Sequence, residues 1–196
     1  MGHPFKHFIL ITKHRHKVIR NASHCGIFFH SLGHDLSKYG PTEFWTSAKY
    51  YVGNMSPIVN ERRNNDFFST ICQHHAKHNK HHWEYWCDWA KGNVIIMTMP
   101  WKYATEYVCD MLSASYTYDK KDFKPETALN YFNTYVGYFH MTNATIEYIR
   151  WCLTRYRDMG WKGLKKKDTK AKYAEITSRN KRVEYILLEG AGELSF

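Results

Sequence analysis

The sequence predicts an all-α fold, and three observations lead to that prediction. Apolar residues recur at spacings of three, four or seven along much of the chain, which is the period of helices with one buried face. Pro41 and Pro100 stand where such a period starts, and proline is common in the first turn of a helix. Strand-like alternation is confined to short ambiguous pieces such as "NVIIMTM". With 196 residues and no internal repeat, the chain is expected to form a single helical domain.

The first helix is predicted over residues 11–32, because the apolar positions there share one face. These positions are Ile11, Val18, Ala22, Cys25, Phe29 and Leu32. His14 lies on the same stripe, whereas His16 does not. His14 is therefore expected to point into the protein.

The later elements follow from breakers and renewed apolar periods. A break at Gly40 precedes a predicted helix over 41–51, with Glu43 in its first turn. The residues "GNMSPIVNERRNN", 53–65, predict a loop because they are rich in glycine, proline and asparagine. Further helices are predicted from 67 into the histidine-rich segment, after Pro100 to 115, over 125–138 and over 144–157.

Composition restricts the class of protein. Hydrophobic residues make up 43% of the chain, which excludes disorder throughout. The formal charge of +10, with 13 histidines in addition, predicts attraction for polyanions such as nucleic acids, nucleotides or other phosphates. Part of this charge lies in "KGLKKKDTKAK", residues 162–172, which is expected to be solvated. A basic loop or insertion is therefore predicted near 161–175.

The location predicted from the sequence is the cytoplasm. No apolar run approaches the roughly 18 residues that a spanning helix needs, and the N-terminal run is too short for a secretory signal. The five cysteines are scattered, odd in number and never spaced as C-x-x-C, which is typical of buried thiols in a reducing compartment. No contact with a membrane is expected, and the oligomeric state stays open.

One histidine, a His-Asp pair and a distant aspartate form a candidate metal-binding set. They are His14, His34, Asp35 and Asp110, in the order H…HD…D. Adjacent residues of a helix point about 100° apart, so a helical core has no reason to bury both His34 and Asp35. Divalent transition metals take imidazole and carboxylate ligands together. The set therefore predicts a site for a divalent cation.

The ordered set resembles the HD superfamily of metal-dependent phosphohydrolases, and "HDLSK" is similar to the H-D-x-x-K form of its two-metal members. This resemblance implies an HD-like helical bundle holding one or two divalent ions, with Mn, Fe, Co, Mg and Zn all open as identities. A second resemblance covers roughly residues 10–155, to a family of short bacterial and phage proteins of unknown function. The stretches that carry it are "HDLSKYGPTEF", "SPIVNERR", "HHAKHNKHHWEYW", "MPWKYATEYVCDM" and "NYF".

A second cluster of histidines lies in "HHAKHNKHH". In two-metal HD enzymes, histidines between the HD pair and the last aspartate hold the second ion, so the resemblance implies that role for His74 and His82. His75 and His81 stand next to them as alternatives. A solvated basic patch, or a structural zinc site using Cys72 or Cys87, are the other interpretations. The tryptophans and tyrosine of "WEYW" are expected to pack in the core rather than stack on a base.

The predicted chemistry is hydrolysis of a small phosphate ester, with a nucleotide as the favoured substrate. Asp35 and Lys38 are assigned as catalytic residues. Asp35 would bridge ions or orient water, and Lys38 would supply a positive charge for the phosphate. The other candidate substrate contacts are His75, His78, Asn79, Lys80 and His81. Two alternatives remain, an iron-dependent oxygenase of the HD type and a nucleic-acid-binding protein with a degenerate site.

Overall fold

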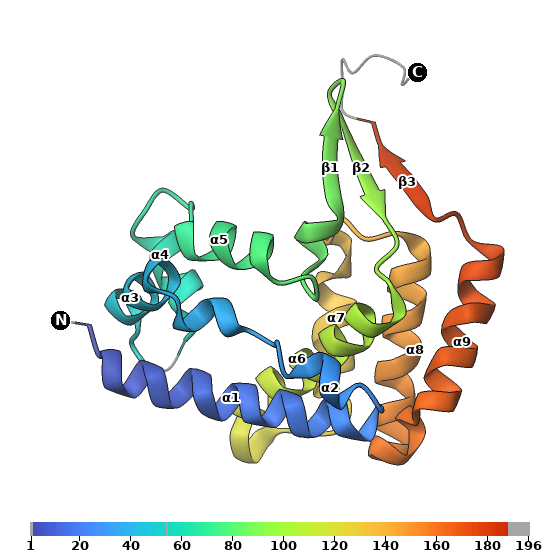
Figure 1. Cartoon of the computed structure of the whole chain (residues 1–196), viewed down its shortest axis with the longest axis horizontal. Coiled ribbons are helices and arrows are strands. Elements are labelled where there is room, and N and C mark those ends of the chain that lie inside the picture. Colours follow the sequence, from blue (N-terminus) through green and yellow to red (C-terminus); the bar gives the residue numbers. More distant parts are fainter. Residues whose placement is uncertain (1, 54, 188–196) are drawn as a thin grey trace.

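The computed structural model describes residues 2–53 and 55–187 (Figure 1). Its α-helices are α1 (Pro4–His24), α2 (Phe28–Ser31), α3 (Pro41–Tyr50), α4 (Pro57–Arg63), α5 (Thr70–His78), α6 (Trp101–Asp119), α7 (Thr127–Tyr135), α8 (Asn143–Met159) and α9 (Lys166–Arg179). Short 3-10 helices are η1 (Leu36–Tyr39), η2 (Trp83–Trp86), η3 (Lys120–Asp122), η4 (Val136–Tyr138) and η5 (Gly160–Leu164). The strands are β1 (Cys87–Ala90), β2 (Asn93–Met97) and β3 (Val183–Ile186).

The core lies where α1, α6 and α8 pack together, with α7 and α9 covering α8 (Figure 1). It is built from the apolar faces that the sequence pattern marked, including Val18, Ala104, Val108, Ile149 and Leu153. The predicted helices over 41–51 and after Pro100 are confirmed as α3 and α6. Helix α6 lies in the middle of this packing. Residues on the face of α6 that points away from α8 can therefore face α1 and α5.

The first helix ends earlier than the apolar stripe predicts. Helix α1 stops at His24, and Gly26 adopts a left-handed conformation with φ of +70°. A Cβ at this position would lie 2.7 Å from the Lys166 side chain, so a larger residue would clash. Beyond the turn Phe29 is 85% exposed, which shows that the stripe no longer faces the core. The prediction of one helix over 11–32 is therefore wrong after residue 24.

The all-α prediction is also wrong in one respect, because the fold contains a small antiparallel sheet in the order β1-β2-β3. The piece "NVIIMTM" supplies β2, whose Val94 and Ile96 are buried. Cys87 pairs with Ile96, and Val94 pairs with Ile186 from the end of the described chain. The sheet extends away from the helices (Figure 1), and the protein is mostly helical. The pairing of β1 with β2 is a local hairpin, whereas the long-range pairing of β2 with β3 has no signal in local periodicity.

Two predicted loops are helical. Residues 57–63 of the expected loop form α4, which starts with Pro57 in its first turn. The lysine-rich run 162–172, expected as a loop, forms the end of η5 and the first half of α9. Helix α9 buries Thr169 and Ile176 while its lysines face outward, so the sparse apolar stripe is enough to dock it. Among the described helices, none combines the length and apolar character needed to cross a membrane.

Candidate metal centre

Imidazoles and carboxylates from four parts of the chain converge between α1, α5 and α6. Within the described residues they form three overlapping groups whose candidate donor atoms lie within 4.8 Å of one another. The groups are His14, His34 and Asp110; Asp35, His75, His81 and His82; and His34, His81 and Glu106. Helix α1 supplies His14, the turn before η1 supplies His34 and Asp35, and α6 supplies Glu106 and Asp110.

The His34-Asp35 pair faces inward because the backbone leaves the helical conformation there. Asp35 has φ of +54° and ψ of +24°, a left-handed conformation that aspartate tolerates better than most residues. Both residues are buried, at 1% and 2% exposure, and His34 Nε2 lies 3.3 Å from Asp35 Oδ2. A continuous helix would have turned one of the two side chains away. The strained turn therefore serves to bring two unlike donors to one place.

His34 is held by a carboxylate on the far side of its ring. Its Nδ1 lies 2.9 Å from Glu106 Oε1, while its Nε2 is buried with no hydrogen-bond partner among the described residues. Burial lowers the pKa of His34, but the carboxylates of Asp35, Glu106 and Asp110 raise it more strongly, to about 10. Without a metal, the ring is thus protonated, and the proton balances negative charge that a cation would otherwise balance.

The three groups share residues and form one cluster, and Asp35 lies at its centre. Its Oδ2 accepts a hydrogen bond from Lys38 Nζ at 2.5 Å, and its Oδ1 lies 3.2 Å from His75 Nε2 and 3.5 Å from His81 Nε2. Burial raises the pKa of Asp35, but His34, Lys38 and His75 hold it well below its usual value. Asp35 is therefore ionised, with each carboxylate oxygen turned toward a different part of the cluster.

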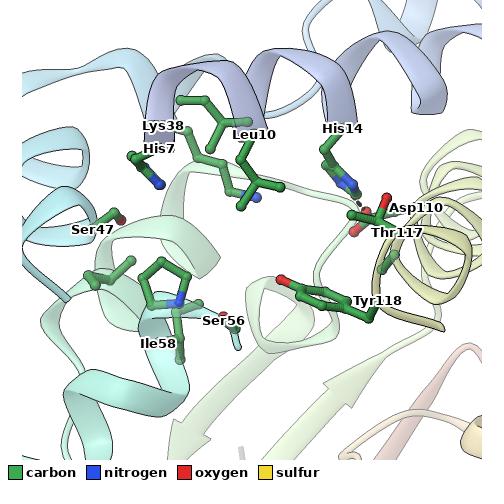
Figure 2. A pocket seen from close by; sticks show the side chains of 14 residues that line it. His7, Leu10, His14, Lys38, Ser47, Ser56, Ile58, Asp110, Thr117 and Tyr118 are labelled. Atoms are coloured by element: carbon green, nitrogen blue, oxygen red, sulfur yellow. Dashed lines mark hydrogen bonds and ion pairs between the residues drawn. The ribbon is translucent and has the colours of Figure 1, made fainter. Parts of the chain in front are cut away.

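Asp110 connects the cluster to α1. Its Oδ1 lies 2.8 Å from His14 Nε2, the contact drawn as a dashed line in Figure 2, and 3.9 Å from His34 Nε2. Its Oδ2 lies 3.7 Å from His81 Nε2. Burial raises the pKa of Asp110, but the hydrogen bond and charge of His14 and the charge of His34 lower it further. Asp110 is ionised like Asp35.

Glu43 supports the cluster from α3. It is fully buried, and its carboxylate lies 2.7 Å from His75 Nδ1 while accepting a hydrogen bond from Ser37 Oγ at 2.7 Å. A carboxylate on the outer nitrogen fixes the ring so that Nε2 faces the cluster, an arrangement common behind metal-binding histidines. Glu43 and Glu106 thus orient His75 and His34 in the same way.

His81 and His82 reach the cluster because α5 ends at His78. The Asn79 side chain donates hydrogen bonds to His75 O at 2.8 Å and to Ser37 Oγ at 2.7 Å, which ties the chain down where it leaves the helix. The two rings lie 4.4 Å apart between centroids. Burial and the neighbouring His34 keep the pKa of His81 well below normal, and burial with His75 lowers that of His82 to about 3. Both rings are neutral, as metal ligands must be.

The donor atoms fit a cation. The buried atoms without a hydrogen-bond partner among the described residues include His34 Nε2, Asp35 Oδ1, His81 Nε2 and His82 Nε2. A buried polar atom without a partner is costly, and one cation would satisfy several such lone pairs at once. Four buried or half-buried carboxylates, from Asp35, Glu43, Glu106 and Asp110, surround this region, and the Lys38 amine pairs with Asp35 there. The local charge therefore favours a cation although the chain as a whole is basic.

Five of the six predicted metal ligands converge in the cluster: His14, His34, Asp35, His82 and Asp110. His74 does not join them. Its Nδ1 lies 3.2 Å from Glu43 Oε2. Near the surface its ring stacks on that of His78, with 4.1 Å between the ring centroids. His75, one residue later and about 100° further round α5, occupies the place expected for His74.

The predicted substrate contacts are spread over different environments. Lys38 lies beside Asp35, and His75 and His81 belong to the ligand groups themselves. Asn79 is buried and holds the end of α5. His78 and Lys80 lie on the surface, where Lys80 Nζ sits over the Tyr85 ring at 5.3 Å. Surface positions therefore give no support to a substrate role for His78 and Lys80.

Glu43 and Glu106 were not predicted as site residues from the sequence. Glu106 lies four residues before Asp110, a spacing that places both on one face of α6 and that the sequence could have shown. Glu106 also lies 2.9 Å from the Nε2 of His30, a second histidine that was not singled out. Glu43 was noticed only as an acidic residue in the first turn of a helix, which carries no hint of its contacts with η1 and α5.

Two cavities flank the cluster. The smaller, of about 180 Å³, is lined by His14, Lys38 and Asp110 among others, and Figure 2 shows the Lys38 amine and the Tyr118 hydroxyl directed into it. The larger, of about 480 Å³, is lined by His82 and Asp110 on the side of the cluster. Asp110, Ala114 and Tyr118 line both cavities, so the cluster can be reached from two sides.

Comparison with protein families identifies the family of this chain. The model of a family of unknown function, DUF5662, matches residues 3–153, and the chain belongs to that family. The match includes every residue of the three donor groups. The searches of curated proteins and of solved structures found no match.

Proposed function

We propose that this DUF5662 protein is a metal-dependent phosphohydrolase of the HD type that acts on a small phosphate ester. The observation that carries the proposal is the convergence, next to a lysine, of buried imidazole and carboxylate atoms that have no hydrogen-bond partner among the described residues. Ordinary folding would not leave such atoms unsatisfied, since each costs free energy. A bound cation that takes part in a reaction would give these atoms a partner.

The donor groups suit two ions. His14, His34 and Asp110 would hold one ion, and His75, His81 and His82 the other, with Asp35 between the two groups. Bound divalent ions supply a water of lowered pKa and stabilise negative charge on a phosphate. Glu106 and Glu43 would keep the Nε2 atoms of His34 and His75 turned toward the ions.

Lys38 is the residue that would contact the phosphate. Burial lowers its pKa, but Asp35 and Asp110 raise it above the usual value, so the amine is charged at every pH at which the protein would act. It lines the smaller cavity beside the cluster, where it can donate to a phosphate oxygen without leaving Asp35. The Tyr118 hydroxyl faces the same space (Figure 2) and offers a second donor.

An assay of phosphate release tests this proposal. The full chain is incubated with nucleoside monophosphates and simple phosphate esters in the presence of Mn²⁺, Co²⁺, Fe²⁺ or Mg²⁺. We expect phosphate release with at least one metal, and a loss of about 100-fold or more in the variant Asp110→Asn. Substitution of the exposed His16 by Gln serves as a control and leaves the rate unchanged. Absence of release with every ester and every metal would contradict the proposal.

An iron-dependent oxygenase is the second candidate. His14, His34 and Asp110 form a set of two histidines and one carboxylate, which is the ligand type of many non-haem iron oxygenases. Oxygen uptake that requires Fe²⁺, without phosphate release, would favour this candidate over hydrolysis.

A further inference from the structure

The larger cavity beside the cluster has a composition that differs from the rest of the site. It lies between α6, α7 and η2 and encloses about 480 Å³, within the range of about 300–1,000 Å³ that is usual for small-molecule sites. His82 and Asp110 form its border with the donor groups. A molecule seated there would therefore touch the cluster at one end.

Aromatic rings form much of the wall. Trp83, Tyr107 and Phe139 are half-buried around the cavity, and Trp83 packs against Phe139 at 6.1 Å between centroids. Tyr118 and Tyr131 also line it, and each is about half exposed. The rings line the cavity without filling it, so space for a ligand remains between them. Such walls bind flat aromatic groups by stacking, as in proteins that bind the bases of single strands.

The polar groups of the cavity are carboxylates, hydroxyls and the uncharged imidazole and indole N–H groups of His82 and Trp83. Asp119, Ser115 and Thr127 line it, and none of the lining residues in the described chain is a lysine or an arginine. A phosphate would have no cationic partner here, whereas the smaller cavity holds Lys38. The Asp119 carboxylate can accept hydrogen bonds from N–H groups on the edge of a base or from sugar hydroxyls.

We infer that the larger cavity is the subsite for the base of a nucleoside phosphate. The base stacks among Trp83, Tyr107 and Phe139, its N–H edge faces Asp119, and its phosphate lies over the cluster beside Lys38. Only the placement of the phosphate rests on the proposed function. Recognition of the base depends on the cavity alone and does not require a metal.

The test is binding of guanosine, a nucleoside without phosphate, to the metal-free full chain, measured by calorimetry with ribose as the control ligand. Guanosine is chosen because its base carries two adjacent N–H donors for a carboxylate. The variant Ser115→Trp fills the larger cavity from the surface of α6, at a half-buried position. The matched control is Ser56→Trp, which places the same side chain in the smaller cavity.

We expect guanosine to bind and ribose to bind far more weakly. Ser115→Trp should weaken guanosine binding by about tenfold or more, and Ser56→Trp should leave it within about twofold, as expected if stacking carries the affinity. No guanosine binding by the wild type, or equal binding by Ser115→Trp, would overturn the inference. If guanosine binds as described but no ester releases phosphate, the subsite stands and the hydrolase proposal fails. If esters with and without a base are hydrolysed equally and Ser115→Trp has no effect, the hydrolase proposal stands and the base subsite fails.

Discussion

At the scale of single residues, the outer partners of the histidines decide which ring nitrogen faces the cluster. Glu106 contacts His34 Nδ1 at 2.9 Å and leaves Nε2 directed inward. The variant Glu106→Gln keeps the size of the side chain but removes the charge that holds the ring. We expect the affinity for Mn²⁺ to fall by about 10–100-fold, as for other carboxylates that hold a metal-binding histidine by its outer nitrogen. Isothermal titration with Mn²⁺ measures this change.

The control for this prediction is Glu175→Gln, which alters an exposed carboxylate paired with Lys172 on α9. It should leave Mn²⁺ affinity unchanged. Equal affinities of the wild type and Glu106→Gln would show that His34 is not oriented by this contact.

His7 gives a prediction about pH. Its ring is 3% exposed, packs beside Phe44 and Tyr51, and has no hydrogen-bond partner at either nitrogen among the described residues. Burial, and then the charge of Lys38, lowers its pKa from 6.5 to about 4. Between these two values the unfolded chain binds a proton that the folded chain does not, so the free energy of unfolding falls as the pH falls.

The variant His7→Phe should remove this contribution. Its free energy of unfolding, measured with urea at several pH values, should fall less steeply between pH 6.5 and about 4 than that of the wild type. His16→Phe, on the exposed side of the same helix, should keep the steep dependence. Identical pH dependence in the wild type and His7→Phe would contradict the assignment.

The residues that form the site were partly predictable from the sequence. The His34-Asp35 pair stood out because a helix does not bury two neighbours, and the structure explains it by the left-handed turn at Asp35. His75 rather than His74 enters the cluster because the rotation of α5 depends on its packing against α3, which local sequence does not show. Both residues lie on histidine-rich helix faces, so periodicity alone could not separate them.

At the scale of elements, the start of α5 depends on a buried glutamate in α4. Glu61 accepts hydrogen bonds from Ser69 Oγ at 2.5 Å, Thr70 Oγ1 at 2.6 Å and the Ile71 backbone N–H at 3.1 Å. It thus satisfies donors at a helix N-terminus that otherwise lack partners. Since α5 carries His75, this contact also helps to place the cluster.

Substitution of Glu61 by Ala should lower the free energy of unfolding by about 1–3 kcal/mol, because buried donors lose their acceptor. Chemical denaturation monitored by circular dichroism measures the change. Glu175→Ala, which removes an exposed carboxylate, should shift the same quantity by less than about 0.5 kcal/mol. A Glu61→Ala protein as stable as the wild type would show that the cap is not needed.

Helices were easier to predict than their ends. The apolar period identified the interiors of α1, α3 and α6, whereas the end of α1 depends on the close approach of Gly26 to Lys166 in α9. Helix α4 was missed because its sequence is rich in breakers, although Pro57 suits a first turn. The β1–β2 hairpin is local, but its strands of four and five residues are too short for clear alternation. Strand β3 was missed because it pairs with β2 across most of the second half of the chain.

At the scale of the whole molecule, the fold brings together residues that are far apart in the sequence. His14 and Asp110 are separated by 96 positions, yet their side chains are 2.8 Å apart. No local pattern predicts such a contact, and the sequence suggested it only through an ordered set of ligand types and a family resemblance. Although the chain has a net charge of +10, the fold gathers four carboxylates at one place, from Asp35, Glu43, Glu106 and Asp110.

The central claim is that this cluster binds divalent metal ions. Equilibrium dialysis against Mn²⁺, followed by elemental analysis of the full chain, measures the number of ions bound by the wild type, His14→Gln and His16→Gln. The last variant is the matched control, because His16 lies on the same helix but is exposed. We expect at least one ion per chain in the wild type and His16→Gln, and fewer in His14→Gln. A wild-type chain that binds no ion, or a His14→Gln chain that binds as many as the wild type, would contradict it.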